Sequence, residues 1–351
     1  MKKILISILL MISISCTHDK TNVIIKNEQN LSMQEIKFSN EASPLFPRGC
    51  LIKDSLLIVF EPKDKVGFLH IYNKNDYSFI RKIGHKGDGP NEFVRPRFMV
   101  NINTQTDNKI LIGDIDGLFS LDILSDSIVK NKEIIFPANL ETYNYVLQNS
   151  NDTLIVNQTR EHQLSVYDKK NDKLLFKDYY DEDLLNGNFS DFAKVNIIYD
   201  AYFTSNEDFI LISYKHFKVI DLISKETLKL VNRIYFPGYN SNQLFFTKKN
   251  EHVTIDNDSK LFFTYAYPTN NGFFVLSLDA KRSEIEEGNA TPIIYEISNK
   301  GMINSIYNLD KAISNFIIEE NAIYAIGLSD ESGELGLFKG DICKTTNLTH
   351  D

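Results

Sequence analysis

Short apolar runs separated by polar turns recur along most of the chain. The run at 56–60 (LLIVF) is followed by a polar break, a second run at 68–73 (FLHIYN) and a third at 78–84 (SFIRKIG). Such runs, bounded by turn residues, are typical of β-strands, and continuous apolar stretches such as LLIV indicate strands covered on both faces. Weaker copies of this unit follow. The six units begin at Leu56, Ile110, Leu154, Phe209, Leu261 and Ala322.

The spacing of these units predicts one β-propeller. Their starts lie 54, 44, 55, 52 and 61 residues apart, and repeats of this size made of short strands and turns are typical of propeller blades. A further strand is predicted ahead of each later unit, at 98–102, 143–147, 197–203, 251–255 and 314–318. The sixth unit then lacks an outer strand.

The alternating segment 32–38 (SMQEIKF) precedes the first unit, and we predict that it supplies the missing strand. This pairing would replace two open sheet edges by a hydrogen-bonded ladder. The predicted fold class is therefore all-β: a six-bladed β-propeller closed by an N-terminal strand, forming a single domain over 31–351.

The start of the chain has the pattern of an export signal. Lys2 and Lys3 precede an apolar run at 4–12 that is too short to span a bilayer as a mature helix. The run ends at 13–16 (SISC), which resembles the lipobox of bacterial lipoproteins. The resemblance implies cleavage before Cys16, diacylation of its thiol, and export to the cell envelope, where we expect anchoring in the outer membrane. The alternative is a plain secretory signal with an incidental cysteine.

The domain boundaries follow from this signal. We assign 1–15 to a lipoprotein signal peptide and the polar segment 16–30 to a flexible tether. Two other cysteines remain, Cys50 and Cys343, near opposite ends of the domain. Because a closed propeller brings its ends together and an exported protein can form disulfides, the two can be bonded. Equally, both can be buried, reduced residues that act as small hydrophobes.

The most distinctive run is GHKGDGPNEF at 84–93. It resembles the GxxGxGPxEF turn of the TolB-like six-bladed β-propeller lipoproteins of Bacteroidetes. The resemblance covers this turn, the lipobox and the blade spacing, and it implies a fold and a compartment but no reaction. The residues that carry it are Gly84, Gly87, Gly89, Pro90, Glu92 and Phe93.

The glycines of this turn do not fit a phosphate-binding loop. Such a loop leads into a helix that carries Lys-Ser or Lys-Thr, whereas here Pro90 and the extended stretch 94–97 (VRPR) follow. We interpret the turn as structural. Gly87 and Gly89 would supply positive φ, Pro90 would stiffen the turn, Phe93 would pack back on the blade, and Glu92 would accept hydrogen bonds from the turn's own amides.

Composition and motif spacing narrow the chemistry. The formal net charge is −9 with no cluster of Lys and Arg, which argues against binding nucleic acid through its phosphates. The seven histidines show no metal-binding spacing, and no motif of a nucleophilic enzyme occurs. We therefore predict no metal and no cofactor.

A ligand site is expected at one mouth of the propeller channel. The loops between the second and third strands of the blades gather there together with the blade-to-blade loops. On this anionic chain, some of these loops carry cationic and aromatic residues, which favours an anionic ligand or an acidic protein segment. The alternative is a solvated charged rim. The candidate ligand-binding residues are Arg97, Arg160, His162, Lys215, His216 and Tyr267.

The predicted function is a binding or scaffolding role in the cell envelope, with the membrane as a partner through the N-terminal lipid. One alternative is a propeller hydrolase or lyase that acts on envelope glycan or peptide. Another is a sensory or accessory subunit of an envelope complex. Several clustered residues with displaced pKa values would favour the enzyme, and a broad apolar patch would favour a protein partner.

Overall fold

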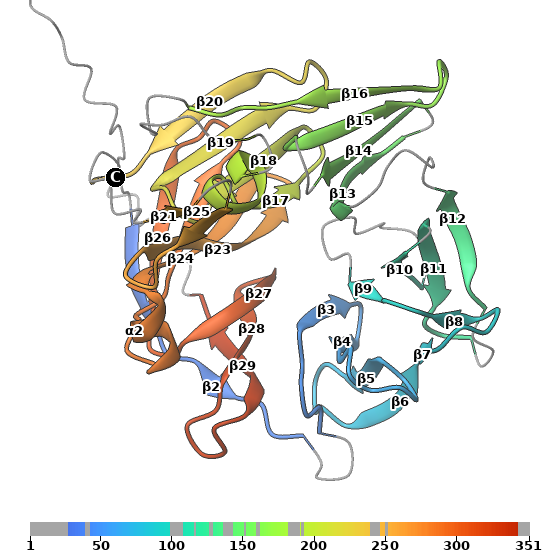
Figure 1. The fold of residues 1–351 in the computed structure, drawn as a ribbon. Coiled ribbons are helices and arrows are strands. Elements are labelled where there is room, and N and C mark those ends of the chain that lie inside the picture. The colour runs from blue at the N-terminus through green and yellow to red at the C-terminus, as the bar shows by residue number, and fades with distance from the viewer. Residues whose placement is uncertain are drawn as a thin grey trace, which may run out of the picture.

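The computed structural model in Figure 1 is almost entirely made of β-strands arranged as a six-bladed propeller, as the sequence predicts. The structure describes residues 27–38, 43–98, 108–115, 117–125, 129–135, 143–150, 152–158, 162–181, 190, 193–238, 246–249 and 252–342. Cys16, Arg160 and Cys343 lie outside these residues. Within them, no helix has the length and apolar character needed to cross a membrane.

The first three blades follow the chain from its blue to its green part in Figure 1. Blade one consists of β3 (Gly49–Lys53), β4 (Leu56–Phe60), β5 (Leu69–Asn73) and β6 (Phe79–Ile83). Blade two consists of β9 (Arg97–Phe98), β10 (Lys109–Asp114), β11 (Gly117–Asp122) and β12 (Asn131–Ile135). Blade three consists of β13 (Tyr143–Asn149), β14 (Thr153–Gln158), β15 (Leu164–Asp168) and β16 (Lys173–Lys177).

The last three blades complete the ring. Blade four consists of β17 (Ala201–Ser205), β18 (Phe209–Tyr214), β19 (Val219–Ser224) and β20 (Leu230–Tyr235). Blade five consists of β23 (Lys260–Thr269), β24 (Gly272–Lys281), β25 (Ile293–Ser298) and β26 (Ile303–Leu309). Blade six consists of β27 (Ile313–Glu319), β28 (Ala322–Leu328), β29 (Leu335–Asp341) and the N-terminal β2 (Gln34–Glu35).

Shorter elements lie between and beside the blades. They are β1 (Asn27–Leu31), β7 (His85–Lys86), β8 (Glu92–Phe93), the π-helical turn η2 (Lys194–Ile198), β21 (Phe246–Lys249), β22 (His252–Ile255) and α2 (Arg282–Glu286).

The apolar core is divided among the joints between blades. Six clusters of buried side chains occur among the described residues, one at each joint. Strand β4 shows how the sequence produces this. Leu57 and Val59 pack toward blade six, whereas Ile58 and Phe60 pack toward blade two. The prediction that continuous apolar runs are covered on both faces is therefore confirmed, and each such side chain contributes about 1.5–3 kcal/mol by burial.

The ring closes through the N-terminal segment, as predicted. β2 pairs antiparallel with β29, and the Ile36 amide donates to the Leu337 carbonyl at 2.8 Å. β1 adds a second contact, because it pairs in parallel with β26 of blade five. We call residues 27–36 the N-terminal clasp. Its side chains Leu31, Met33 and Ile36 are buried.

The clasp corrects one domain boundary. Residues 27–30, assigned from sequence to the flexible tether, belong to β1 and therefore to the propeller. Their sequence, NEQN, is polar, and their side chains alternate between exposed and half-buried. The segment is ordered by backbone pairing with β26 and not by apolar burial, so no hydrophobic pattern marks it.

Blade five corrects a strand assignment. The predicted inner strand at 251–255 is instead part of a separate hairpin, in which β21 pairs with β22. The innermost strand of blade five is β23, and its fourth strand is β26, which was not predicted. The prediction therefore placed β23, β24 and β25 one position too far out in the blade.

The turn at 84–93 has the structural role expected, with one correction. Gly84 has φ +80°, and a Cβ there would lie 2.5 Å from the Phe68 ring. Gly87 and Gly89, in contrast, do not have the predicted positive φ. They are needed because the Glu92 side chain lies against them, and a Cβ on Gly87 would come within 2.0 Å of its carboxylate.

Glu92 and Phe93 behave as predicted. The Glu92 carboxylate accepts a hydrogen bond from the Gly89 amide at 2.9 Å. The Phe93 ring is fully buried, with edge-on contacts to Phe68 of blade one and Phe119 of blade two. The turn therefore packs into the joint between these blades.

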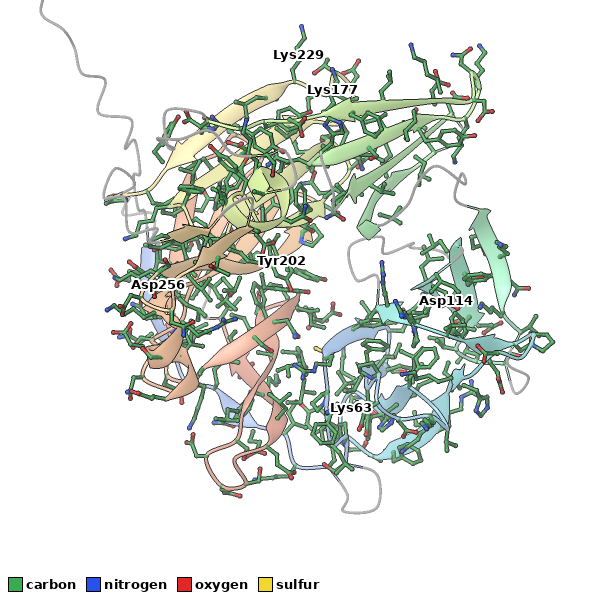
Figure 2. All side chains as sticks on the ribbon, in the orientation of Figure 1. Lys63, Asp114, Lys177, Tyr202, Lys229 and Asp256 are labelled. Atoms are coloured by element: carbon green, nitrogen blue, oxygen red, sulfur yellow. The ribbon has the colours of Figure 1, made fainter. Side chains whose placement is uncertain are left out.

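Carboxylates fix the chain where it enters a blade. Asp114, labelled in Figure 2, is buried at the end of β10 and accepts hydrogen bonds from the amides of Val94 and Arg95 at 3.2 and 2.8 Å. It also accepts a hydrogen bond from Lys130 Nζ at 2.8 Å. Glu61 follows β4 of blade one and accepts from two amides in the same way, those of Leu45 and Phe46. These are structural uses of acidic residues.

Candidate functional site

The predicted cationic sector is largely neutralised. His162 Nδ1 lies 2.8 Å from the Asp178 carboxylate, and its ring stacks on Phe176. Lys215 Nζ lies 2.7 Å from the Asp200 carboxylate. Burial lowers the pKa of His216, so its imidazole adds no positive charge at neutral pH. An anionic ligand would have to displace these carboxylates.

Two more of the predicted ligand-binding residues, Arg97 and Tyr267, lie on innermost strands of their blades. Arg97 lies on the inner strand β9 and is half-buried. Tyr267 lies near the far end of β23, whereas Lys215 contacts the beginning of that strand, where the Phe262 amide donates to its carbonyl at 2.7 Å. Five residues of strand separate Phe262 from Tyr267, roughly 16 Å. Tyr267 therefore does not share a mouth with Lys215, and its placement there followed from the shifted strand assignment.

Tyr267 instead belongs to a group of aromatic rings on the inner strands. Tyr202 of β17, labelled in Figure 2, contacts Tyr265 of β23 edge-on at 5.4 Å, and Tyr265 contacts Phe316 of β27 at the same distance. Tyr267 lies 6.4 Å from Phe316. These rings connect blades four, five and six, which gives them a packing role.

Cys50 is also part of the interior. It is a free thiol, 1% exposed, whose Sγ lies 3.9 Å from the Tyr324 carbonyl across the joint between blades one and six. Burial raises its pKa to about 12, so the thiol stays protonated and unreactive. The structure thus has Cys50 as the buried reduced residue of the second alternative, while Cys343 lies outside the described residues.

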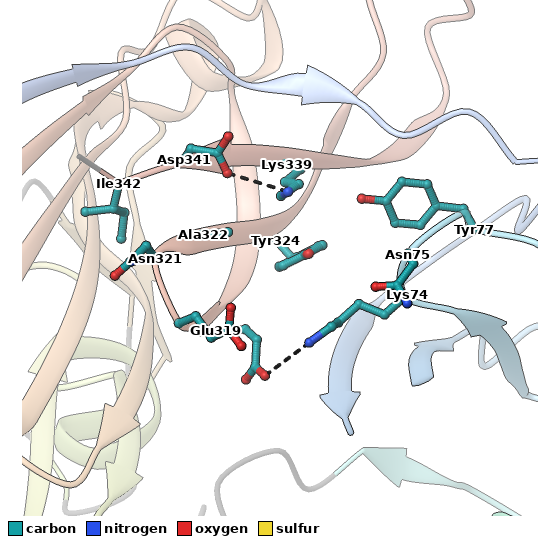
Figure 3. A pocket seen from close by; sticks show the side chains of 11 residues that line it. Lys74, Asn75, Tyr77, Glu319, Asn321, Ala322, Tyr324, Lys339, Asp341 and Ile342 are labelled. Carbon is teal, nitrogen blue, oxygen red and sulfur yellow. Dashed lines mark ion pairs between the residues drawn. The ribbon is translucent and has the colours of Figure 1, made fainter. Parts of the chain in front are cut away.

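The strongest candidate site is a cavity at this same joint, shown in Figure 3. Its volume is about 390 Å³, within the range of small-molecule sites. Blade one contributes the turn between β5 and β6, and blade six contributes the turn between β27 and β28 together with β29. The polar residues of its lining include Lys74, Asn75, Tyr77, Glu319, Glu320, Asn321, Lys339 and Asp341.

The turn of blade one is shaped by its own backbone. The Tyr77 amide donates to the Asn73 carbonyl at 2.9 Å, and the Asn75 amide donates to the Asn73 side chain at 2.8 Å. Tyr77 then adopts φ +57°, a left-handed conformation that is unusual for a bulky residue. This conformation directs the chain so that Lys74, Asn75 and Tyr77 all line the cavity.

Charges of both signs line the cavity, and they are loosely paired. Lys74 Nζ lies 3.6 Å from Glu319 Oε1, and Lys339 Nζ lies 3.6 Å from Asp341 Oδ1; both pairs are drawn in Figure 3. Tight ammonium–carboxylate hydrogen bonds are about 2.7–2.9 Å long. The exposed fractions of these four side chains run from 21% to 79%, so they can rearrange around a ligand at small cost.

Tyr324 forms part of the cavity wall. It is 5% exposed, and Lys339 Nζ lies 5.8 Å from the centre of its ring. Burial raises its pKa above the usual value, and the nearby Tyr77 phenol, which hydrogen-bonds to it, raises it further. The Tyr324 hydroxyl therefore remains a neutral hydrogen-bonding group.

A second hollow of about 570 Å³ adjoins the clasp. It is lined by residues 27–32 and by Asp341, which also lines the cavity. The two hollows thus share the end of β29. The sequence analysis missed both, because their residues lie on turns far apart in the chain and carry no motif.

A polar cluster in blade one is structural. The buried His70 Nε2 lies 3.0 Å from the Asp64 carboxylate and 3.6 Å from that of Glu61. Burial acts to raise the pKa of Asp64, but its hydrogen bonds, above all that from Lys82, outweigh burial and bring it to about 2. In the part of the chain that the structure describes, no three His, Cys, Asp or Glu side chains gather as metal ligands.

The fold is similar to solved bacterial propellers. A member of the DUF4221 family from Bacteroides vulgatus matches with a TM-score of 0.58 at 10% identity, over 88% of this chain and 97% of that one. A Bacteroides fragilis protein described as exported matches with a TM-score of 0.51 at 14% identity, over 92% of this chain and 100% of that one. At these identities the likeness shows the fold alone. No family model and no curated protein matches the sequence.

Proposed function

We propose that this chain is an exported, lipid-anchored propeller of the cell envelope that binds a small ligand in the cavity between blades one and six. Three observations support export and anchoring: the lipobox-like sequence ending at Cys16, the turn at 84–93 that resembles TolB-like lipoproteins of Bacteroidetes, and the similarity of fold to an exported Bacteroides protein. The outer membrane is the proposed location.

The cavity carries the binding part of the proposal. It opens at the joint where the ring closes, it is lined by two blades, and its charges are loosely paired. The earlier candidates, His162 and Lys215, are held by carboxylates of their own. The cavity therefore has the more available polar groups.

The clasp relates the cavity to the membrane. Asn27 pairs with Ser305 near the start of β26, so the chain enters β1 where β25 turns into β26. The turn between β5 and β6, which lines the cavity, is the corresponding turn of blade one. Only 17–26 separate Cys16 from Asn27, a reach of about 40 Å at most. The anchored chain would thus enter the propeller on the face of the ring that carries the cavity turn.

Anchoring is tested by labelling cells with an alkyne fatty acid and isolating the protein. The wild type should carry the label and sediment with outer membranes, whereas Cys16→Ser should lose both properties. An unlabelled wild-type protein would contradict the anchor.

Binding is tested by incubating the purified propeller with a digest of envelope peptidoglycan and polysaccharide, and identifying retained molecules by mass spectrometry. Asn75→Trp would place a ring in the cavity and should abolish retention. Glu226→Trp is the matched control, because Glu226 occupies the same position in the corresponding turn of blade four, outside the cavity. Equal retention by both variants would exclude the cavity as the site.

A further inference from the structure

The charges of the cavity restrict the ligand. Its lining contains three carboxylates, from Glu319, Glu320 and Asp341, and two ammonium groups, from Lys74 and Lys339. The lining therefore has a net negative charge while still offering cations. A simple anion would meet an excess of carboxylates, which argues against an anionic ligand in this cavity.

The aromatic residues argue against a sugar that stacks on a ring. Tyr324 is 5% exposed and has Lys339 above its face. The Tyr77 ring packs edge-on against Phe38, with centroids 6.3 Å apart. Both tyrosine rings thus already have neighbours, and the charged residues of the lining outnumber its aromatic ones.

The spacing of the inner pair fits a zwitterionic head group. An α-amino acid carries its ammonium and carboxylate on one carbon, so the two charges lie side by side. Lys74 and Glu319 also lie side by side, 3.6 Å apart, and they are the less exposed of the two pairs. The ligand carboxylate can pair with Lys74 while its ammonium pairs with Glu319, which gives each charge an opposite partner.

The rest of the cavity suits a basic side chain. Ala322 and Ile342 give one part of the wall apolar character, next to the carboxylates of Glu320 and Asp341. Methylene groups can pack on the apolar part while a terminal ammonium reaches the carboxylates. A positive side chain also offsets the net negative charge of the lining.

We infer that the cavity binds a diamino acid, with its α-carboxylate on Lys74, its α-ammonium on Glu319 and its side-chain ammonium toward Asp341. This assignment rests on the proposed binding role of the cavity and names its ligand class.

Calorimetry with lysine as the probe tests it. Lysine amide, Nα-acetyl-lysine and norleucine each remove one of the three charges, and each should bind at least tenfold more weakly than lysine. Glutamate should not bind at millimolar concentration. Lys74→Met should bind lysine and lysine amide equally. Glu319→Gln should bind lysine and Nα-acetyl-lysine equally. Asp341→Asn should bind lysine and norleucine equally.

Lys225→Met is the matched control, because Lys225 occupies the position of Lys74 in the turn of blade four and bonds there to the Asn206 carbonyl. It should keep all three preferences. Absence of lysine binding, equal binding of the capped forms to the wild type, or tighter binding of glutamate would each overturn the inference. If another probe binds and Asn75→Trp abolishes its binding, the cavity stands as a site and the diamino acid is wrong.

Discussion

The joint between blades three and four and the joint between blades six and one use the same local turn in opposite ways. Each has a five-residue turn that ends in a left-handed residue, Leu228 with φ +52° and Tyr77 with φ +57°. At the first joint, the Tyr179 hydroxyl donates to the Leu228 carbonyl at 2.9 Å, and both residues pack against the apolar cluster of the joint. At the second, the turn forms the wall of a cavity.

The charge pairs at the two joints also differ, both in distance and in burial. Beside the joint between blades three and four, Arg233 of β20 makes two hydrogen bonds to the Asp221 carboxylate of the neighbouring strand β19, at 2.7 and 2.8 Å, and Asp221 is fully buried. Arg233 also donates to the Tyr179 carbonyl, which follows the last strand of blade three. Between blades six and one, Lys74 and Glu319 lie 3.6 Å apart and are partly exposed. Buried pairs are costly to break, whereas exposed pairs are cheap to rearrange. The comparison teaches that close, buried charge pairs stabilise the fold, whereas longer, partly exposed pairs can rearrange at small cost.

The largest expected effect concerns how the second joint is held. The C-terminal strands β27, β28 and β29 of blade six do not lead on to blade one, so the clasp joins them to the start of the chain. Deleting residues 27–36 removes the buried Leu31, Met33 and Ile36 and should lower the free energy of unfolding by at least about 4 kcal/mol. Urea denaturation followed by circular dichroism measures this. Gln34→Ala, an exposed change within the clasp, should have little effect. An unchanged midpoint after the deletion would refute closure by the clasp.

The next effect concerns the pair of Arg233 and Asp221 beside the joint between blades three and four. Arg233→Met leaves the buried Asp221 carboxylate without its main partner and should cost about 3–5 kcal/mol. The double variant Asp221→Leu/Arg233→Met removes both charges and should recover much of this loss, measured by the same denaturation. If the single variant is as stable as the wild type, the tight pair does not stabilise the fold.

A smaller effect is the pH dependence of stability that Tyr179 produces at the joint between blades three and four. Burial, followed by the charges of Asp178 and Asp221, raises the pKa of Tyr179 to about 12, whereas an unfolded tyrosine titrates near 10. The protonated phenol thus favours the folded state: its contribution is fully present below pH 10 and is lost as the pH rises to about 12. The unfolding midpoint should fall over this range, and less steeply in Tyr179→Phe. Parallel pH profiles would contradict a buried phenol at this position.

Sequence patterns predicted what depends on local chemistry. The run at 56–60 showed a strand covered on both faces, and 32–38 showed the closing strand. The polar β1 gave no such signal, because its order comes from backbone pairing with β26. The partners of the cationic sector gave no signal for a related reason: Asp178 and Asp200, which neutralise His162 and Lys215, face them only after the blades form. The cavity was beyond prediction, because it joins Lys74 to Glu319 across the ring closure.

The smallest expected effect on stability comes from the Lys74–Glu319 pair, and it tests the comparison of the two joints directly. Lys74→Met and Glu319→Gln each disturb a loose, partly exposed pair, so each should change the free energy of unfolding by no more than about 1 kcal/mol. Their double variant should show a coupling energy well below that of Arg233 with Asp221, because the gain from a charge pair depends on desolvation and close contact. Urea denaturation of the four proteins in each cycle measures both couplings. A strong coupling between Lys74 and Glu319 would mean that this pair stabilises the contact between blades six and one. The charge pairs at the two joints would then both be structural.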